Sequence, residues 1–149
     1  MYYVEENYDT AYLYFKKFVK GREDNGLDIY VQENAKIARV YQKMGLEEKA
    51  EQLFLDFTEY CDTDQSTYKS ANLAVKYAYE GNLERAIEQL RIFSEADNYL
   101  YWFMLIENEP ILKPLKTHPE FDTIIQKIQD RFWENQARLK ASLEEEGLL

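Results

Sequence analysis

A chain of 149 residues with 46% hydrophobic and 15% aromatic residues has enough apolar surface to form one domain with an ordinary core, which excludes a disordered polypeptide. The net charge of −10 argues against a protein that binds nucleic acid or an anionic membrane through a broad basic surface. The single cysteine, Cys61, excludes an internal disulfide and a cysteine-rich zinc site, and it suits a reducing compartment.

Met1–Thr10 lacks the basic start and the apolar stretch of a signal peptide. The most apolar run, Tyr99–Ile106, is far shorter than the roughly 20 residues that a bilayer-spanning helix needs. We therefore expect a cytoplasmic protein.

The first predicted element is a helix within residues 6–20. Ala11, Phe15 and Phe18 fall at helical spacing there, and the polar segment Lys20–Gly26 is expected to be a loop. We expect this helix to be the second half of a helix pair whose first half would precede Met1. A half pair exposes an apolar face. We therefore expect the chain to be the C-terminal part of a longer protein, or to self-associate through this face.

Two complete helix pairs are predicted next, at residues 28–62 and 65–98. In each pair, apolar residues at helical spacing are followed by a glycine, Gly45 or Gly81, where a helix would end in a left-handed cap. The apolar sets are Tyr30, Ile37, Ala38 and Tyr41, and then Leu73, Ala74 and Tyr77. A second helix resumes directly after each glycine, and helices joined by so short a turn pack antiparallel.

The second helices of the two pairs repeat one pattern. Ala50-x3-Phe54-x2-Phe57 recurs 36 residues later as Ala86-x3-Leu90-x2-Phe93. A small residue lets two helices approach closely, and large residues one and two turns later fill the space beyond. This pattern resembles the tetratricopeptide repeat, which has Leu-Gly-x2-Tyr, then Ala-x3-Phe, and a period near 34 residues. The tryptophan and proline positions of that repeat hold other residues here: Asn34, Ser70, Asp62 and Asn98.

The resemblance implies an all-α fold in which antiparallel helix pairs stack as a right-handed superhelix. First helices would line a concave groove, and second helices would form a convex back. Residues 99–147 predict a degenerate final repeat and a long capping helix. Tyr99–Glu107 predicts a short helix, and three prolines then break the chain into turns.

The capping helix is expected to run from the Thr117-x2-Glu120 capping box to about Gly147. Apolar residues at helical spacing predict its inward face: Phe121, Ile125, Ile128 and Phe132.

No arrangement of residues in the sequence predicts catalysis. His118 is the only histidine and lies within the predicted capping turn, which indicates a structural role. Cys61 has no evident activating base, so a small buried thiol is expected. With no glycine-rich phosphate loop either, we expect no enzyme activity, no metal and no cofactor.

The predicted groove supplies the candidate binding residues. On the first helix of the first pair they are Gln32, Lys36, Arg39 and Lys43, and 36 residues later they are Tyr68, Asn72, Val75 and Tyr79. The first row is basic and the second is aromatic and polar, whereas the second helices are acidic. Three interpretations remain open for the basic row. It is a solvated helix face, a site for an acidic peptide, or a clamp for a C-terminal carboxylate that uses Arg39 and Asn72.

Two functions fit these features. The first is a non-catalytic scaffold that binds a protein or peptide partner in the groove and contacts neither nucleic acid nor membrane. An acidic segment is one candidate for this partner. The alternative is a regulatory or sensing C-terminal domain of a larger bacterial signalling or transcription-regulating protein whose activity lies upstream. An enzyme built on these helices is disfavoured, because the residues for catalysis are missing.

Overall fold

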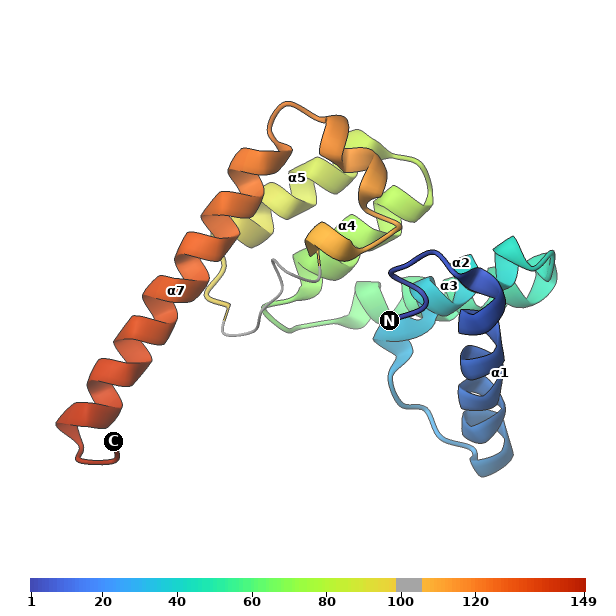
Figure 1. Ribbon diagram of the computed structural model, residues 1–149, viewed down its shortest axis with the longest axis horizontal. Helices are drawn as coiled ribbons and strands as arrows, with labels where there is room; N and C mark the ends of the chain where they lie inside the picture. The colour runs from blue at the N-terminus through green and yellow to red at the C-terminus, as the bar shows by residue number, and fades with distance from the viewer. Residues whose placement is uncertain (99–105) are drawn as a thin grey trace. The chain divides into compact units, whose positions relative to one another are not determined.

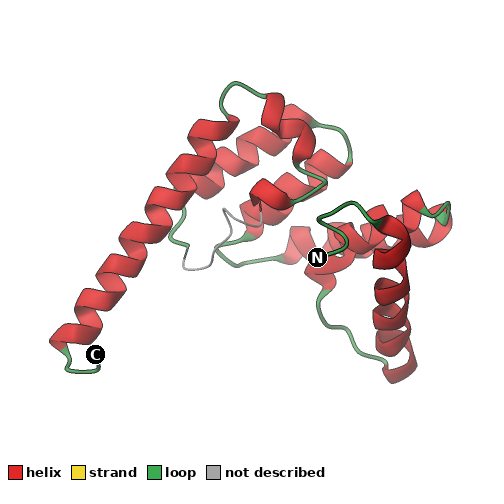
Figure 2. Cartoon of the chain, viewed as in Figure 1, coloured by secondary structure: helices red, strands yellow, loops and turns green. Residues whose placement is uncertain are grey.

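The computed structural model describes residues 1–98 and 106–149, and these ranges contain helices and turns but no strand (Figures 1 and 2). The all-α prediction is confirmed for these ranges. The chain divides into two compact units, Met1–Asp64 and Gln65–Leu149, and the division falls between the two predicted helix pairs. In the described part of the chain, no helix has both the length and the apolar character needed to cross a membrane.

In the first unit, each α-helix packs against the next one along the chain (Figure 1). The helices of this unit are α1 (Tyr8–Asn25), the 3-10 helix η1 (Val31–Glu33), α2 (Asn34–Lys43) and α3 (Glu47–Thr63). Only three residues connect α2 to α3, and the two helices pack along one another. Their shared core contains Ile37 and Ala38 from α2 and Ala50 and Phe57 from α3, all buried. The helices α2 and α3 therefore form one packed helix pair.

The turn before a second helix occurs three times with one hydrogen-bond pattern. In each copy, an amide N–H donates to a tyrosine carbonyl oxygen five residues earlier, and the residue before that amide has positive φ. The pairs are Asn7 to Tyr2 at 2.9 Å, Leu46 to Tyr41 at 3.0 Å and Asn82 to Tyr77 at 2.8 Å. The positive-φ residues are Glu6 at 55°, Gly45 at 72° and Gly81 at 80°. The left-handed caps predicted at the two glycines are confirmed, and the same turn precedes α1.

The helix α1 is longer than the sequence analysis predicts, and the predicted loop at Lys20–Gly26 is wrong. The helix continues to Asn25 and ends at Gly26, which has φ 59°. Within this stretch Lys20 pairs with Asp24 one turn later at 2.7 Å, a spacing that favours helix. The segment that connects α1 to η1 therefore comprises residues 26–30. Tyr30 is exposed and has φ 56°, so its predicted place in the buried stripe of the first helix is also wrong.

The residues before α1 cover part of its apolar face. Tyr3 is buried in a cluster with Ala11 of α1 and Val40 of α2. Its ring lies edge-on to Phe15, with 6.2 Å between the ring centroids. Leu13, on another side of α1, remains exposed. Part of the open face that the sequence predicts is therefore closed by the chain's own first turn.

The second unit begins with the other predicted helix pair, α4 (Lys69–Tyr79) and α5 (Leu83–Ser94) (Figure 1). Further along its described residues lie the 3-10 helix η2 (Lys113–Thr117) and α7 (Phe121–Glu145). The helix α5 packs against α4 and also against η2 and α7. The short helix predicted at Tyr99–Glu107 lies mostly outside the described residues.

The inward face predicted for α7 is confirmed, because all four apolar residues of its stripe are buried: Phe121, Ile125, Ile128 and Phe132. Beyond this stripe the amide nitrogen of buried Asn135 donates to the Asn98 carbonyl oxygen at 2.9 Å. Leu139, further along, is exposed. The helix ends at Glu145, two residues before Gly147. Only the first half of α7 is therefore embedded in the unit.

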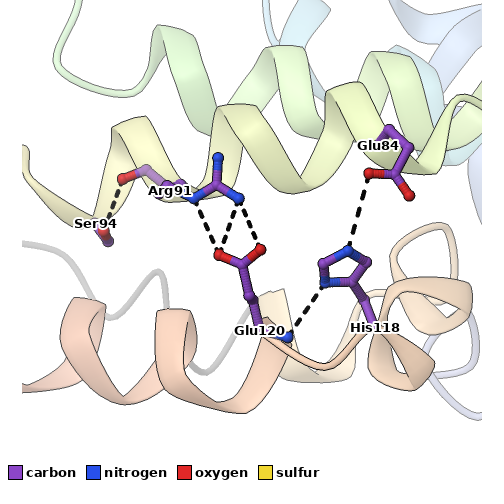
Figure 3. Close-up of polar contacts among 5 residues, drawn as sticks. All are labelled: Glu84, Arg91, Ser94, His118 and Glu120. Carbon is purple, nitrogen blue, oxygen red and sulfur yellow. Dashed lines mark hydrogen bonds and ion pairs between the residues drawn. The ribbon is translucent and has the colours of Figure 1, made fainter.

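The capping box predicted for α7 is wrong. Thr117 Oγ1 donates to the Pro114 carbonyl oxygen at 3.0 Å, and the helix begins at Phe121. The Glu120 carboxylate turns to α5, where it accepts hydrogen bonds from Arg91 Nε at 3.2 Å and Nη2 at 2.9 Å (Figure 3). His118 Nδ1 accepts the Glu120 N–H at 3.2 Å. The residues predicted to cap α7 thus shape the preceding turn and attach it to α5.

The Arg91–Glu120 pair should contribute about 0.2–1 kcal/mol to stability, because both side chains are exposed to water. A double-mutant cycle with Arg91→Ala and Glu120→Ala, followed by urea unfolding, measures this coupling. It should fall further when the salt concentration is raised to about 0.5 M. A coupling of about 3 kcal/mol, unchanged by salt, would contradict this surface assignment.

Candidate functional site

The basic row of the predicted groove lies on one face of the first unit. Lys36, Arg39 and Lys43 are spaced by three and four residues on α2 and therefore share a helical face, which we call the α2 basic face. Lys36 Nζ pairs with Glu33 Oε2 at 2.8 Å, and Arg39 Nη1 donates to Gln42 Oε1 at 3.2 Å. Lys43 is exposed, whereas Gln32 is half-buried in η1. The structure thus brings three of these four residues together on α2.

The aromatic row lies on the second unit, along α4. Val75 and Tyr79 are half-buried on this helix. Tyr68 directly precedes α4, and its ring centroid is 6.0 Å from that of Phe93 on α5. Asn72 is only 4% exposed. Its amide therefore offers little surface to a terminal carboxylate, which makes the clamp interpretation the least favoured of the three.

The helix α3 carries the acidic surface that the sequence predicts for a second helix. Its exposed carboxylates are Glu47, Glu48, Glu51, Glu59 and Asp62. Lys49 is the single basic residue of this helix. The first unit therefore has a basic face on α2 and an acidic surface on α3.

The first unit also contains an open groove that the sequence analysis did not predict. It lies between α1 and α3, has a volume of about 1040 Å³, and is bordered by the segment that connects α1 to η1. We call it the α1–α3 groove. Leu27 and Ile29 are exposed apolar residues in that connecting segment, where polar residues are usual. Those two residues were the sequence signal that could have indicated a special surface here.

Arg22 holds the connecting segment at one end of the α1–α3 groove. Its guanidinium donates to the Ile29 carbonyl oxygen at 3.0 Å and to Oδ1 of buried Asn34 at 2.8 Å. It also lies 5.0 Å from the centre of the Phe18 ring, close enough for a cation–π interaction. These contacts tie α1 to the connecting segment and to α2 at this end of the groove.

The electrostatic environment of the groove is visible at Tyr41, which contributes to its lining. Burial raises the pKa of the Tyr41 hydroxyl, Tyr12 and the Glu23 carboxylate raise it further, and Arg22 opposes them. The neutral phenol is therefore favoured over the phenolate at this position.

Within residues 1–98 and 106–149, no group of three or more histidine, cysteine, aspartate or glutamate side chains is placed to hold a metal ion. Cys61 is buried in α3, as the sequence predicts.

The sequence matches no protein-family model, and comparisons with curated proteins and with solved structures found no significant match. A function for this chain is therefore inferred from its own residues and geometry.

Proposed function

We propose that this protein is a non-catalytic interaction scaffold of the tetratricopeptide-like superhelical kind, and that its α2 basic face binds an acidic segment of a partner protein. The repeated helix pair is the observation that carries this proposal. Ala50 in α3 and Ala86 in α5 are 2% and 0% exposed, and each helix follows the same left-handed turn. Small residues at such contacts allow the close helix approach on which tetratricopeptide-like pairs depend.

The arrangement of the α2 basic face supports an acidic partner. Arg39 and Lys43 attract a carboxylate-rich segment at long range and raise the association rate, whereas the charge of Lys36 is offset by its ion pair with Glu33. The Arg39 guanidinium can also donate two hydrogen bonds to one carboxylate. Contacts from Glu33 and Gln42 hold Lys36 and Arg39 near the helix, which lowers the entropy that these side chains lose on binding.

The aromatic row on α4 supports the same kind of function in the second unit. Tyrosines supply large contact areas with few rotatable bonds, and their hydroxyl groups can hydrogen-bond at the edge of an interface. Tyr79 and Val75 lie four residues apart, so they share a face of α4. Such a face suits the apolar side chains of a partner segment.

Photo-crosslinking tests the proposal. A benzoylphenylalanine placed at Lys43 should crosslink to a partner in cells of the source organism, whereas the same group at Glu51 on α3 should not. The double variant Arg39→Glu with Lys43→Glu should weaken recovery of that partner by about tenfold or more, since both attractions become repulsions. Circular dichroism should show an unchanged helix content.

The matched control reverses two acidic side chains of α3 with the changes Glu47→Lys and Glu51→Lys. Both residues are exposed, so this variant should fold and retain the partner. Loss of the partner in the control together with its retention in the α2 variant would show that α2 is not the binding face.

A further inference from the structure

The lining of the α1–α3 groove carries an excess of negative charge. Its five carboxylates are Glu23, Asp28, Glu48, Asp56 and Glu59. The two basic side chains of the lining are Arg22 and Lys49. Arg22 already donates hydrogen bonds to the Ile29 carbonyl oxygen and to Asn34 Oδ1. The groove therefore presents mainly acceptors, and a ligand with positive charge complements it.

Apolar side chains lie among these carboxylates. Val19 of α1 and Leu53 of α3 are buried where they meet the groove, and Val31 adds to the same lining. Leu27 borders the groove and is 49% exposed. Val19 and Leu53 are already buried by the chain, so Leu27 and the half-buried Val31 supply the apolar surface that loses contact with water when an apolar side chain covers it, and this burial favours binding. The ligand that fits therefore combines positive charge with apolar groups.

The carboxylates of α3 are spaced along the groove. Glu48 and Asp56 are eight residues apart, which corresponds to about 12 Å along the helix axis. The position of Asp56 is supported by the Gln52 side-chain amide, which donates to its Oδ1 at 2.9 Å. Lysines or arginines seven or eight residues apart on a helical ligand would match this separation. A single small cation would not span it.

We infer that the α1–α3 groove is a second binding site, which takes a cationic amphipathic segment of a partner protein. The volume of about 1040 Å³ is slightly above the usual range of small-molecule pockets, and the groove is partly open to solvent. An amphipathic helix lying in the groove places its apolar face on Leu27 and Val31 and its cations beside the carboxylates. The first unit then binds segments of opposite charge on two surfaces, the α2 basic face and this groove.

The test uses the full chain and a fluorescein-labelled synthetic peptide of about 16 residues, with leucines along one helical face and lysines seven residues apart. Fluorescence anisotropy measures its dissociation constant. The groove variant Glu48→Gln with Asp56→Asn and Glu59→Gln should weaken binding by about tenfold or more. The matched control neutralises three exposed carboxylates at the end of α7, with Glu144→Gln, Glu145→Gln and Glu146→Gln, and should bind within about twofold of the original protein. Both variants change the net charge equally.

The apolar part of the proposal has its own test. Replacing the peptide leucines with serine should weaken binding by about tenfold, because the apolar lining then remains exposed. Leu27→Ser should weaken binding of the original peptide about threefold, and its exposed position leaves the fold intact.

Three results would overturn the proposal. Equal weakening in the groove variant and the α7 control would indicate non-specific attraction to an acidic protein. Equal binding of the leucine and serine peptides, or of spermine, would indicate a counterion site. Failure of the leucine peptide to bind saturably below about 100 µM would exclude a peptide site of useful affinity.

Discussion

Replacing Phe132 with alanine should lower the free energy of unfolding by about 3–5 kcal/mol, the largest effect that we expect from a single substitution in this chain. Phe132 lies in the embedded half of α7 and is fully buried. Its removal takes away the burial of an aromatic ring and leaves a cavity that the rigid helices around it can close only in part. Urea unfolding followed by circular dichroism measures the loss.

The adjacent residue provides a matched control. Trp133 is 52% exposed, and its ring lies edge-on to Phe132 with 4.9 Å between the centroids. Trp133→Ala removes a larger side chain, yet it should cost less than about 1.5 kcal/mol because half of that side chain already contacts water. Consecutive helical residues point about 100° apart. A larger loss for Trp133→Ala than for Phe132→Ala would therefore show that α7 presents a different face to the core.

Replacing Ala86 with leucine should lower the free energy of unfolding by about 1–3 kcal/mol, because the side chain has no room at this helix contact. Ala86 has no exposed surface on α5, the helix that packs along α4. Ala50 has the equivalent place on α3, and Ala50→Leu should have a similar effect in the first unit. A loss of this size lowers the melting temperature by roughly 4 °C or more.

The control for the alanine variants is Ala141→Leu on the exposed half of α7. Leucine is nearly as good a helix former as alanine, so this change should alter stability by less than about 0.5 kcal/mol. If Ala50→Leu and Ala86→Leu were both as harmless as the control, the alanines would not lie at the closest helix approach. The alignment of the two helix pairs would then have to be shifted.

Local sequence patterns predicted the helices that begin after a tight turn. Gly45 and Gly81 adopt positive φ, which glycine does at no steric cost, and helices resume two residues later. Ala50 and Ala86 were predicted as packing positions from their spacing alone, and both are buried. These successes share one cause, since helix periodicity and turn conformation depend on residues within a few positions of one another.

The failures also have identifiable causes. The polar composition of Lys20–Gly26 suggested a loop, but an ion pair between Lys20 and Asp24 is compatible with a helix that ends at Gly26. Gly26 itself was a usable signal for that end. The capping-box prediction failed for a different reason: Glu120 pairs with Arg91, which is 29 residues away in the sequence. Local spacing contains no information about that partner.

The sequence by itself determined the all-helical class, the two helix pairs, their left-handed turns and the basic row on α2, because each follows from spacings of three, four or 36 residues. Only the tertiary structure decided that Asn72 is buried and that α1 and α3 leave an acidic groove between them. The physical reason is that burial and concavity depend on the distance between helices that are far apart in the chain. For the groove, that distance depends on the contacts that Arg22 makes between α1, the connecting segment and α2, and in both units it depends on the packing of side chains from several elements at once.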